Sequence, residues 1–426
     1  MASSVMVSPI DLKNKKVTIL GAARSGIAAA NLVAQLGAMA RLSEFKSEMA
    51  VRDEISQLDS RVTREFGGHS RALIEDSDLI VLSPGIRQDI DPVLWARQKN
   101  IPVIGEIELG YLCCPCPIVA ITGSNGKTTV STLIAECLRR AGRNVYLCGN
   151  IGQSFTKFIP ALKEQDIVVL EVSSFQLETT VHFRPHIGVL LNFSENHLDR
   201  HADLDEYFEA KWKMFANQRA EDFAVLNFDS PRMRNMTHTI NSRVSYFNAP
   251  EKIRSDRNPN EWAVMEVAML MGISRDVCLE VFKSFKGVEH RMELVRTLNG
   301  VEYINDSKST TAEATRWALE RLSRPAFWIC GGRDKNIDFS VLKPLVGIKV
   351  KKIMAIGEAK DKVDSVFSQV VPVEKFDSLE AAVHSSRMNA KSGECVIISP
   401  MCASFDMFKN FEHRGTVFKH IVNQLV

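Results

Sequence analysis

The run Thr-Gly-Ser-Asn-Gly-Lys-Thr-Thr at residues 122–129 constrains the fold more than any other feature of this sequence. It follows the apolar residues 118–121 and precedes an amphipathic stretch from Val130 to Ala141, so it predicts a strand, a tight glycine turn and a helix. Such a turn directs backbone amides and the positive end of the helix towards an anion. A unit of this kind is typical of an α/β fold with a mostly parallel sheet.

The run departs from the strict phosphate-loop pattern G-x-x-x-x-G-K-[ST], because Ile121 occupies the place of its first glycine. The second glycine, the lysine and the threonine of the pattern are present as Gly126, Lys127 and Thr128. Lys127 would reach the β- and γ-phosphates of a nucleotide, and the Thr128 hydroxyl would bind Mg²⁺. An ordinary glycine-rich turn is the alternative, but the whole combination favours an ATP site formed by Gly123, Ser124, Asn125, Gly126, Lys127, Thr128 and Thr129.

Ionisable side chains follow two further predicted strands. Glu171 comes directly after the strand 167–170, and His197 belongs to a dense polar cluster, 194–201, after the strand 187–191. A glutamate at a strand end is by default a solvated surface residue, and a lone histidine is more often structural. Both positions, however, lie at the carboxyl edge of the sheet that carries the phosphate loop, where a metal that assists phosphoryl transfer is bound. We therefore expect Glu171 and His197 to be metal ligands.

The length of 426 residues exceeds what one hydrophobic core usually supports. Prolines at 115 and 117 interrupt the pattern before the phosphate-loop strand, and Gly287 follows the last helix of the middle segment. After Gly287, three apolar runs each end in a glycine or serine turn and suggest a further open sheet. We predict three α/β domains, with residues 1–106 Rossmann-like, 107–287 a P-loop ATPase domain and 288–426 Rossmann-like.

The N-terminal segment opens with the strand 16–20 and the turn Gly21 to Gly26, a Rossmann-type beginning. Ala23 stands where the dinucleotide fingerprint has its middle glycine, so a pyrophosphate would approach the backbone less closely. Glu44 follows the next strand, where an acidic residue meets a ribose hydroxyl, and Gly85 lies in a turn that a phosphate or sugar can approach. A nicotinamide-dependent oxidoreductase is one function compatible with this opening, although Ala23 counts against it.

The charge balance limits the classes of partner. The 53 basic and 51 acidic residues nearly cancel, so no global field attracts nucleic acid or a membrane surface.

The start of the chain lacks the apolar core of a signal peptide, and we expect a cytoplasmic protein. The nine cysteines then carry reduced thiols. The Cys-Cys-Pro-Cys run at 113–116 resembles half a zinc site, but without a second pair nearby a proline-stiffened connector is preferred.

Motifs in all three segments resemble those of the Mur ligases, which build the peptide of bacterial peptidoglycan. The resemblance rests on the phosphate loop 122–129, the turn Gly-Asn-Ile-Gly at 149–152 and the run Asn-Asp-Ser-Lys at 305–308. Residues 171–178 and 306–310 are similar to the branch of the family that adds D-glutamate. The closing segments 399–406 and 409–415 look like those of the same branch, so the resemblance covers nearly the whole chain.

The resemblance implies a reaction and its participants. Members of the family activate a substrate carboxylate with ATP as an acyl phosphate, which the amine of an amino acid attacks to form an amide. For this branch the substrates are UDP-N-acetylmuramoyl-L-alanine, D-glutamate and ATP, and two Mg²⁺ ions are expected. We also expect a monomer in the bacterial cytoplasm, with no nucleic-acid or membrane partner.

The resemblance assigns further residues. Glu171 and His197 would hold a second Mg²⁺, Asn150 would lie beside the nucleotide and its metal, and Lys211 would be carbamylated to help position that metal. Without the resemblance Lys211 reads as a solvated helix residue. UDP would contact Arg24, Ser25, Glu44 and Gly85; D-glutamate would contact Thr310, Lys335, Ser404, Phe405 and Phe411; and the nucleotide would also contact Asn260, His290, Arg291, Asp306 and Lys308.

Three positions depart from the family pattern. Asn196 replaces an aspartate, Thr311 replaces an asparagine, and residues 257–260 replace the His-Asn pair that opens the adenine-contacting helix. These departures leave open a degenerate ligase that binds nucleotide without turnover. Folylpolyglutamate synthase shares the ATPase core, but it has no UDP-binding domain, whereas about a hundred residues precede the phosphate loop here.

Overall fold

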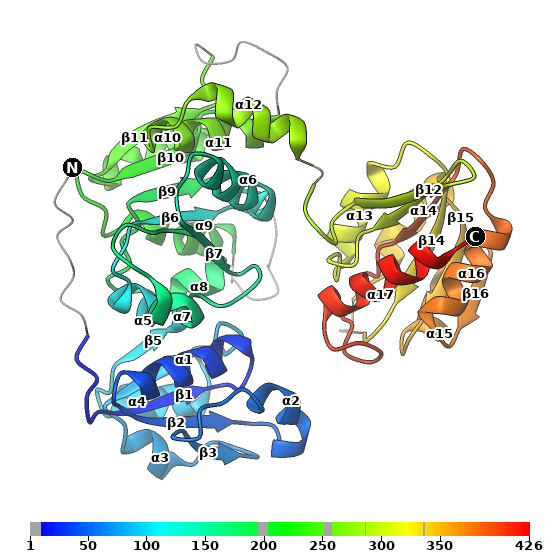
Figure 1. The fold of residues 1–426 in the computed structure, drawn as a ribbon. Coiled ribbons are helices and arrows are strands. Elements are labelled where there is room, and N and C mark those ends of the chain that lie inside the picture. The colour runs from blue at the N-terminus through cyan, green and yellow to red at the C-terminus, as the bar shows by residue number, and fades with distance from the viewer. Residues whose placement is uncertain (1–9, 195–202, 251–257, 286, 335–336) are drawn as a thin grey trace. The chain divides into compact units, whose positions relative to one another are not determined.

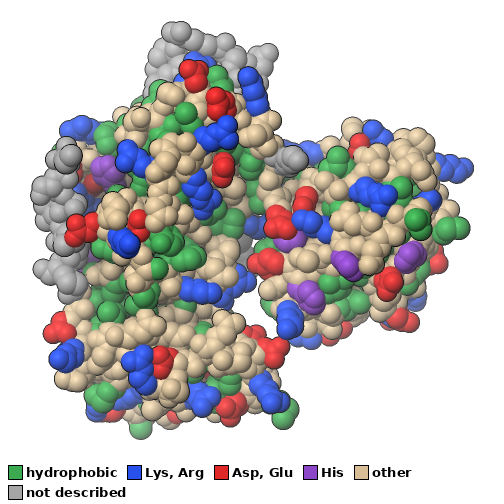
Figure 2. Space-filling view, in the orientation of Figure 1, with side chains coloured by type: hydrophobic (Ala, Val, Ile, Leu, Met, Phe, Trp, Pro, Cys, Tyr) green, Lys and Arg blue, Asp and Glu red, His purple; other side chains and the backbone are tan. Residues whose placement is uncertain are grey.

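The computed structural model describes residues 10–194, 203–250, 258–285, 287–334 and 337–426. The chain forms two compact units, residues 1–285 and 286–426 (Figure 1). Acidic and basic side chains are interspersed on the face of each unit that Figure 2 shows, in keeping with the small net charge of +2. None of the described helices combines the length and the apolar character that crossing a membrane requires.

The first unit begins with a five-stranded parallel sheet in the order β3-β2-β1-β4-β5. The central strands are buried on both faces because helices cover the sheet, which explains their continuous apolar sequences. The elements are β1 (Lys16–Leu20), α1 (Arg24–Gln35), β2 (Met39–Glu44), α2 (Arg52–Ile55), β3 (Thr63–Phe66), α3 (Arg71–Glu75), β4 (Leu79–Leu82), α4 (Asp91–Gln98) and β5 (Val103–Gly105).

Close packing of α1 on the end of β1 explains a glycine of the Rossmann-type turn. A Cβ atom on Gly26 would lie 1.8 Å from the carbonyl oxygen of Gly21 and 2.5 Å from Oγ of Ser83. The Ser83 hydroxyl in turn donates to the Gly21 carbonyl over 3.0 Å. Gly26 is therefore required by helix–strand packing, which is the role of the last glycine in the dinucleotide fingerprint.

The second sheet of the unit has six parallel strands in the order β11-β10-β9-β6-β8-β7. One apolar cluster packs α6, α11 and α12 against one face of this sheet. The elements are α5 (Glu106–Cys113), β6 (Ile118–Thr122), α6 (Lys127–Arg140), β7 (Val145–Gly149), α7 (Phe155–Phe158), β8 (Ile167–Glu171), α8 (Ser174–Glu178), β9 (Ile187–Leu190), α9 (Leu204–Trp212), β10 (Phe223–Asn227), α10 (Pro231–Met236), β11 (Arg243–Phe247), α11 (Pro259–Leu270) and α12 (Arg275–Ser284).

Two buried glutamates of α5 fasten the first sheet to the second. Glu106 accepts hydrogen bonds from the amide and the hydroxyl of Thr156, over 2.8 and 2.7 Å, and burial raises the pKa of this carboxyl. Glu108 accepts from three consecutive backbone amides at 181–183. A continuous apolar core that includes residues of both sheets surrounds the junction.

The second unit contains one six-stranded sheet in the order β12-β13-β17-β14-β15-β16, parallel except for the pair β12–β13. Separate apolar clusters cover its two faces. The elements are β12 (Glu293–Leu298), β13 (Val301–Asn305), α13 (Ala312–Glu320), β14 (Ala326–Gly331), α14 (Lys343–Lys349), β15 (Val350–Ile356), α15 (Lys360–Phe367), β16 (Val373–Phe376), α16 (Leu379–Asn389), β17 (Cys395–Ile398) and α17 (Phe411–Gln424).

The predicted α/β class with mostly parallel sheets is confirmed. The sequence predicted only β14, β15 and β17 for the last sheet, because β12, β13 and β16 carry no continuous apolar run. Helices α1, α6 and α11 each begin three residues before the first residue of the apolar repeat, which is Ile27, Val130 and Trp262 respectively. Their first turns lie at the carboxyl edge of each sheet, where polar residues replace the apolar pattern.

Candidate active site

The phosphate loop joins the end of β6 to the start of α6, as predicted. Gly126 precedes the helix with φ of +81°, a left-handed conformation that favours glycine. A Cβ atom at this position would lie 2.8 Å from Oδ1 of Asn260, so the first turn of α11 sits against the loop. The turn therefore presents the N-terminus of a 14-residue helix with Asn260 at its side.

Hydrogen bonds from residues that the sequence did not predict hold the phosphate loop in place. Asn192 accepts from the amide of Asn125 over 2.8 Å and donates from Nδ2 to the carbonyl of the same residue over 3.1 Å. The Ser124 hydroxyl bonds to the backbone of Ser194 and lies 3.4 Å from the hydroxyl of Tyr207. Asn192 directly follows the apolar run 187–191, so its place at the sheet edge was the signal available in the sequence.

Two lysines converge on the loop. Lys127 donates to the carbonyl oxygens of Gly123 and Ser124, over 2.7 and 3.1 Å. Lys211 comes from α9, is only 1% exposed and donates to the Gly123 carbonyl over 3.2 Å. Burial holds the pKa of Lys211 well below its ordinary value, and the charge of Lys127 lowers that pKa further. The reading of Lys211 as a solvated helix residue, made without the resemblance, is therefore wrong.

Glu171 ends β8, and Asn150 directly follows the adjacent strand β7 at the same edge. Glu171 of β8 pairs in register with Ile121 of β6 on one side and with Gly149 of β7 on the other. Asn150 donates from Nδ2 to Oε1 of Glu171 over 2.8 Å, and its amide donates to the Glu171 carbonyl over the same distance. Glu171 is 1% exposed and not a solvated surface residue, which its position at a strand end suggested by default.

The donor set of this edge fits a hard cation such as Mg²⁺. Oε2 of Glu171 is buried and has no hydrogen-bond partner among the described residues. A buried carboxylate oxygen without a partner is costly unless a cation or a proton balances it. Thr128 is the second residue of α6, the helix that follows the neighbouring strand β6, and its hydroxyl suits the same ion. His197, the other predicted ligand, lies outside the described residues.

In the first sheet, the predicted UDP-contacting residues gather at the carboxyl edge. Glu44 ends β2, and its carboxylate accepts from the amide of Ala22 in the β1–α1 turn over 2.6 Å. Arg24 and Ser25 begin α1, and the guanidinium of Arg24 donates to the carbonyl of Gly152 beside the second sheet. Gly85 is exposed, and a Cβ atom there would meet nothing within 4 Å. The four positions thus border one open edge.

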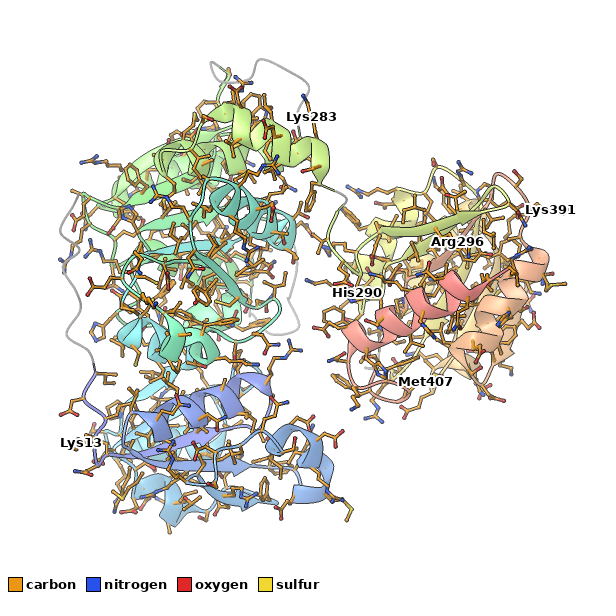
Figure 3. All side chains as sticks on the ribbon, viewed as in Figure 1. Lys13, Lys283, His290, Arg296, Lys391 and Met407 are labelled. Atoms are coloured by element: carbon orange, nitrogen blue, oxygen red, sulfur yellow. The ribbon has the colours of Figure 1, made fainter. Side chains whose placement is uncertain are left out.

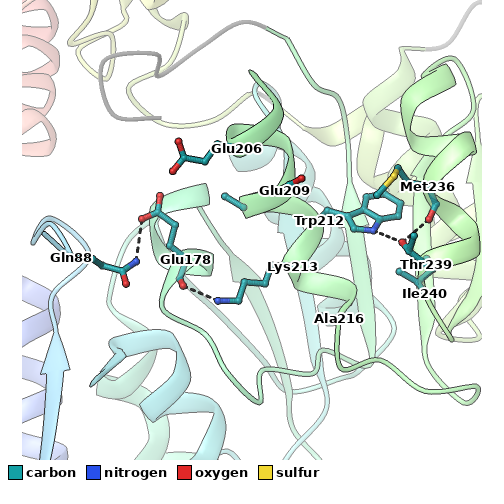
Figure 4. A pocket seen from close by; sticks show the side chains of 11 residues that line it. Gln88, Glu178, Glu206, Glu209, Trp212, Lys213, Ala216, Met236, Thr239 and Ile240 are labelled. Atoms are coloured by element: carbon teal, nitrogen blue, oxygen red, sulfur yellow. Dashed lines mark hydrogen bonds between the residues drawn. The ribbon is translucent and has the colours of Figure 1, made fainter. Parts of the chain in front are cut away.

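A hollow of about 590 Å³ lies elsewhere, beside α8 and α9 (Figure 4). Lys213 points across it and donates to the carbonyl of Glu178, while the indole of Trp212 donates to the hydroxyl of Thr239. Among the residues that the structure describes, none of the predicted site residues lines it. Helix α9 contributes Glu209 to the hollow and directs Lys211 to the phosphate loop, so we do not identify the hollow with the catalytic centre.

The second unit holds Asp306, the predicted nucleotide contact, directly after β13. This carboxylate accepts from the Ser399 hydroxyl over 2.8 Å and from the amide of Met292 over 3.2 Å. Burial raises its pKa to about 6, although the hydrogen bonds and Arg291 act in the opposite direction. His290, labelled in Figure 3, lies beside α17, because a Cβ atom on Gly415 would be 2.2 Å from its Nδ1.

Arg414 connects the loops that carry the predicted D-glutamate contacts, and sequence reasoning did not single it out. It is 1% exposed and donates to the hydroxyl and carbonyl of Ser307 over 3.0 Å each, and to the carbonyl of Cys402 over 3.3 Å. The loops that it joins contain Thr310, which is half-buried, Ser404, which is buried, and Phe405, which is 61% exposed. Phe411 begins α17, and Lys335 lies outside the described residues.

Comparison with protein families identifies all three parts of the chain. Residues 15–105 match the Mur ligase MurD-like N-terminal domain, residues 121–284 the Mur ligase middle domain, and residues 290–402 the Mur ligase glutamate ligase domain. The chain is also 38% identical to a UDP-N-acetylmuramoylalanine--D-glutamate ligase of Koribacter versatilis, over 98% of this chain and 99% of the relative. The chain belongs to the Mur ligase family.

Solved structures of Mur ligases and a related enzyme have the same fold. A MurF ligase of Thermotoga maritima in complex with ADP has a TM-score of 0.59 at 17% identity, covering 90% of this chain and 95% of that one. FolC of E. coli in complex with ADP has a TM-score of 0.56 at 14% identity, covering 75% of this chain and 92% of that one. Use of ATP by this Mur ligase accords with both the fold and the phosphate loop.

Two of the departures from the family pattern fall on described residues. Thr311 is the N-cap of α13 and accepts from the amide of Ala314 over 3.2 Å, so it keeps the capping role that an asparagine would have. Asn260 lies in the first turn of α11, whose N-cap is Asn258. Asn196 and Arg257 lie outside the described residues. The described substitutions are therefore compatible with an intact site.

Replacing Glu171 by glutamine tests the metal assignment of this Mur ligase. The variant keeps the size of the side chain and loses its charge, so we expect the Mg²⁺ concentration for half-maximal phosphate release to rise roughly 10–100-fold. The measurement is substrate-dependent phosphate release during a MgCl₂ titration. Glu164→Gln, at an exposed position before β8, is the control and should match the wild type. An unchanged Mg²⁺ requirement in Glu171→Gln would rule out the ligand role.

The raised pKa of Asp306 predicts a pH-dependent stability. The folded protein keeps its proton up to about pH 6, whereas the unfolded chain loses it near the ordinary value of 3.8. The folded state therefore binds more protons between these values, and the free energy of unfolding falls as the pH rises through this window, by about 2–3 kcal/mol at most. Denaturant unfolding of the wild type and Asp306→Asn between pH 4 and 7 should show a smaller fall in the variant. Parallel curves would contradict the prediction.

Proposed function

We propose that this Mur ligase joins D-glutamate to UDP-N-acetylmuramoyl-L-alanine with cleavage of ATP to ADP and phosphate, in peptidoglycan precursor synthesis. The relative at 38% identity is a ligase of that name, and the similarity covers nearly the whole of both chains. The structural observation that carries the proposal is the grouping of Lys127, Lys211, Glu171 and Asn150 at the phosphate-loop edge. UDP-sugar and amino acid are small-molecule partners, and a cytoplasmic monomer remains our expectation.

The proposed reaction has two steps. A carboxylate oxygen of the alanyl residue attacks the γ-phosphorus of ATP, the bond to the β-γ bridging oxygen breaks, and an acyl phosphate and ADP form. The amine of D-glutamate then attacks the acyl carbon, loses a proton and displaces phosphate, which leaves the amide. Both steps bring anions together, so positive charge at the loop stabilises their transition states.

The residues at the phosphate-loop edge of the sheet would have distinct roles. The N-terminus of α6 and Lys127 bind the phosphates and hold the γ-phosphorus in line with the attacking oxygen. Thr128, Glu171, His197 and a carbamylated Lys211 would hold Mg²⁺. That ion, when bound, neutralises charge on the phosphate oxygens. Asn150 fixes the Glu171 carboxylate through its 2.8 Å hydrogen bond.

Carbamylation of Lys211 is supported by its surroundings. Its amine lies 3.2 Å from a loop carbonyl and has a second ammonium, that of Lys127, as a neighbour. A neutral amine adds to CO₂ to give a carbamate and one proton. The product would carry a negative charge beside Lys127 and the metal site, in place of a buried positive charge that both repel.

In the second unit, Thr310, Ser404, Phe405, Phe411 and Lys335 would bind D-glutamate, and Arg291 and Asp306 would reach the nucleotide. A lysine for the side-chain carboxylate and hydroxyl donors for the α-carboxylate suit this amino acid. Arg414 would act as a positioning residue, because its hydrogen bonds join the loops at 307 and 402–403.

A radiolabel assay tests the function. Incubation with ATP, Mg²⁺, UDP-N-acetylmuramoyl-L-alanine and D-[14C]glutamate should give a labelled nucleotide product, and none without ATP. Acceptance of L-lysine, L-alanine or a dipeptide in place of D-glutamate would overturn the choice of substrate. A folate substrate should give no product. Folylpolyglutamate synthase has no UDP-binding domain, whereas the sheet that would bind UDP precedes the ATPase domain in this chain. The oxidoreductase alternative requires NAD binding, which a fluorescence titration measures.

A further inference from the structure

An exposed aromatic side chain lies at the end of β2, beside the proposed UDP site. Phe45 is 74% exposed, although burying a phenylalanine side chain is normally favourable. It directly follows Glu44, whose carboxylate holds the amide of Ala22 in the β1–α1 turn. In open parallel sheets ligands bind at the carboxyl ends of the strands, and the acidic residue that ends the second strand lies near a ribose. Phe45 thus lies one residue beyond the expected ribose position.

A chain of hydrogen bonds holds a second ring against Phe45. The Ser43 hydroxyl donates to Oε2 of Glu65 over 2.8 Å, so its only proton is engaged, and Nδ1 of His69 must donate to the same hydroxyl oxygen over 2.8 Å. The imidazole and the Phe45 ring are 6.4 Å apart between centroids and tilted by 41°. Partial burial lowers the pKa of His69, which keeps the ring neutral near pH 7.

The space next to these rings is open. The loop after β3 passes beside the loop after β2, since the amide of Gly67 donates to the carbonyl of Lys46 over 3.0 Å and that of Gly68 to the carbonyl of Glu44 over 3.4 Å. A Cβ atom on either glycine would meet no heavy atom within 4 Å. A planar group can therefore approach Phe45 without a clash from this loop.

We propose that Phe45 stacks on the pyrimidine base of the UDP moiety and that His69 positions the Phe45 ring. The inference rests on the proposed function, because that function supplies a uridine nucleotide as substrate. The flat face of a base is the ligand that an exposed aromatic ring beside a ribose site fits best. The alternative occupant of an exposed phenylalanine is another protein surface, and the experiment below separates the two.

Kinetics of Phe45→Ala provide the test. Loss of one stacking contact should raise KM for UDP-N-acetylmuramoyl-L-alanine and the inhibition constant of free UDP about tenfold. The values of kcat and of KM for ATP and D-glutamate should stay within about twofold of the wild type. Phe45→Tyr should behave like the wild type, since it keeps the ring. His69→Ala should raise the same KM without lowering kcat.

Met49→Ala is the matched control, because Met49 is 86% exposed and only four positions further along the chain. It should leave every constant unchanged. If Phe45→Ala matched this control in an active enzyme, or changed all KM values alike, the stacking role would be overturned.

A binding experiment keeps the inference separate from the proposed function. In Phe45→Trp, saturable quenching of the added indole emission by UDP, absent with D-glutamate, supports stacking even if no ligase product forms. Missing ligase product alone would count against the function and not against the base site. Emission that UDP leaves unchanged would overturn the inference, whatever the enzyme catalyses.

Discussion

Lys127→Ala will lower substrate-dependent phosphate release by roughly 10²–10³-fold, the usual effect of losing one preorganised charge from a phosphoryl-transfer site. The Lys127 amine is held at the phosphate loop by the carbonyls of Gly123 and Ser124, 2.7 and 3.1 Å away. It therefore needs little reorganisation to meet the β- and γ-phosphates. The measurement is phosphate release with both co-substrates present, together with kcat and KM for ATP.

Arg140→Ala is the control for this prediction. Arg140 lies in the last turn of the same helix, α6, and forms an exposed ion pair with Glu280 at 3.2 Å. Exposed pairs contribute little to stability, so this variant should keep near-normal activity. Circular dichroism and a thermal melt should show that both variants are folded. Persistent phosphate release in a folded Lys127→Ala protein would exclude the assigned role, and release that never depends on substrates would favour the degenerate-ligase alternative.

Much of the fold could be predicted because the sheets are buried on both faces. Strands such as β6 and β8 are fully buried and read as continuous apolar runs, each followed by a glycine turn or a polar residue. Three strands of the second unit were missed, and two of them, β12 and β16, are edge strands. The hairpin of β12 and β13 turns at Asn299 and Gly300, both with positive φ, and its outer strand has no continuous apolar run.

The predicted site residues could be placed on the right strands, but not their contacts. The sequence shows that Glu171 ends a strand. It does not show that Asn150 lies 2.8 Å from the Glu171 carboxylate, because that contact depends on the order β6-β8-β7. Asn192 and Arg414 were missed for the same reason. Each acts on loops that are distant along the chain and that only the assembled sheets bring together.

Lys211 shows the limit of local sequence information most clearly. It lies in a helix with acidic neighbours, which is typical of a solvated position, yet its amine is buried against Gly123, 88 residues earlier in the chain. The aromatic ring of Tyr207, one turn before it, has its centroid 4.5 Å from the amine. An ammonium on an aromatic face is stabilised, but the neighbouring Lys127 opposes that charge.

Lys211→Ala will therefore lose most of its activity, by roughly 10²-fold or more if a carbamate normally supports the metal site. Acetate, formate or propionate should restore part of it, because a small carboxylate can fill the cavity left by the side chain and supply the oxygens of the carbamate. Lys213→Ala is the matched control. Lys213 lies two residues further on, and its amine donates to the Glu178 carbonyl on the hollow side of the helix. This variant should stay active and should not respond to carboxylates.

Three measurements decide between a carbamate and a structural lysine at this position. The first is activity against carboxylate concentration in Lys211→Ala, where a saturable rise supports the carbamate. The second is ¹³C NMR of the wild type after exposure to ¹³CO₂, where one carbamate resonance should appear that is absent from Lys211→Ala and present in Lys213→Ala. The third is a thermal melt of each variant. If the folded Lys211→Ala protein were near-normal in activity, or inactive without any rescue while the wild type gave no resonance, the amine would serve only to hold the loop through Gly123.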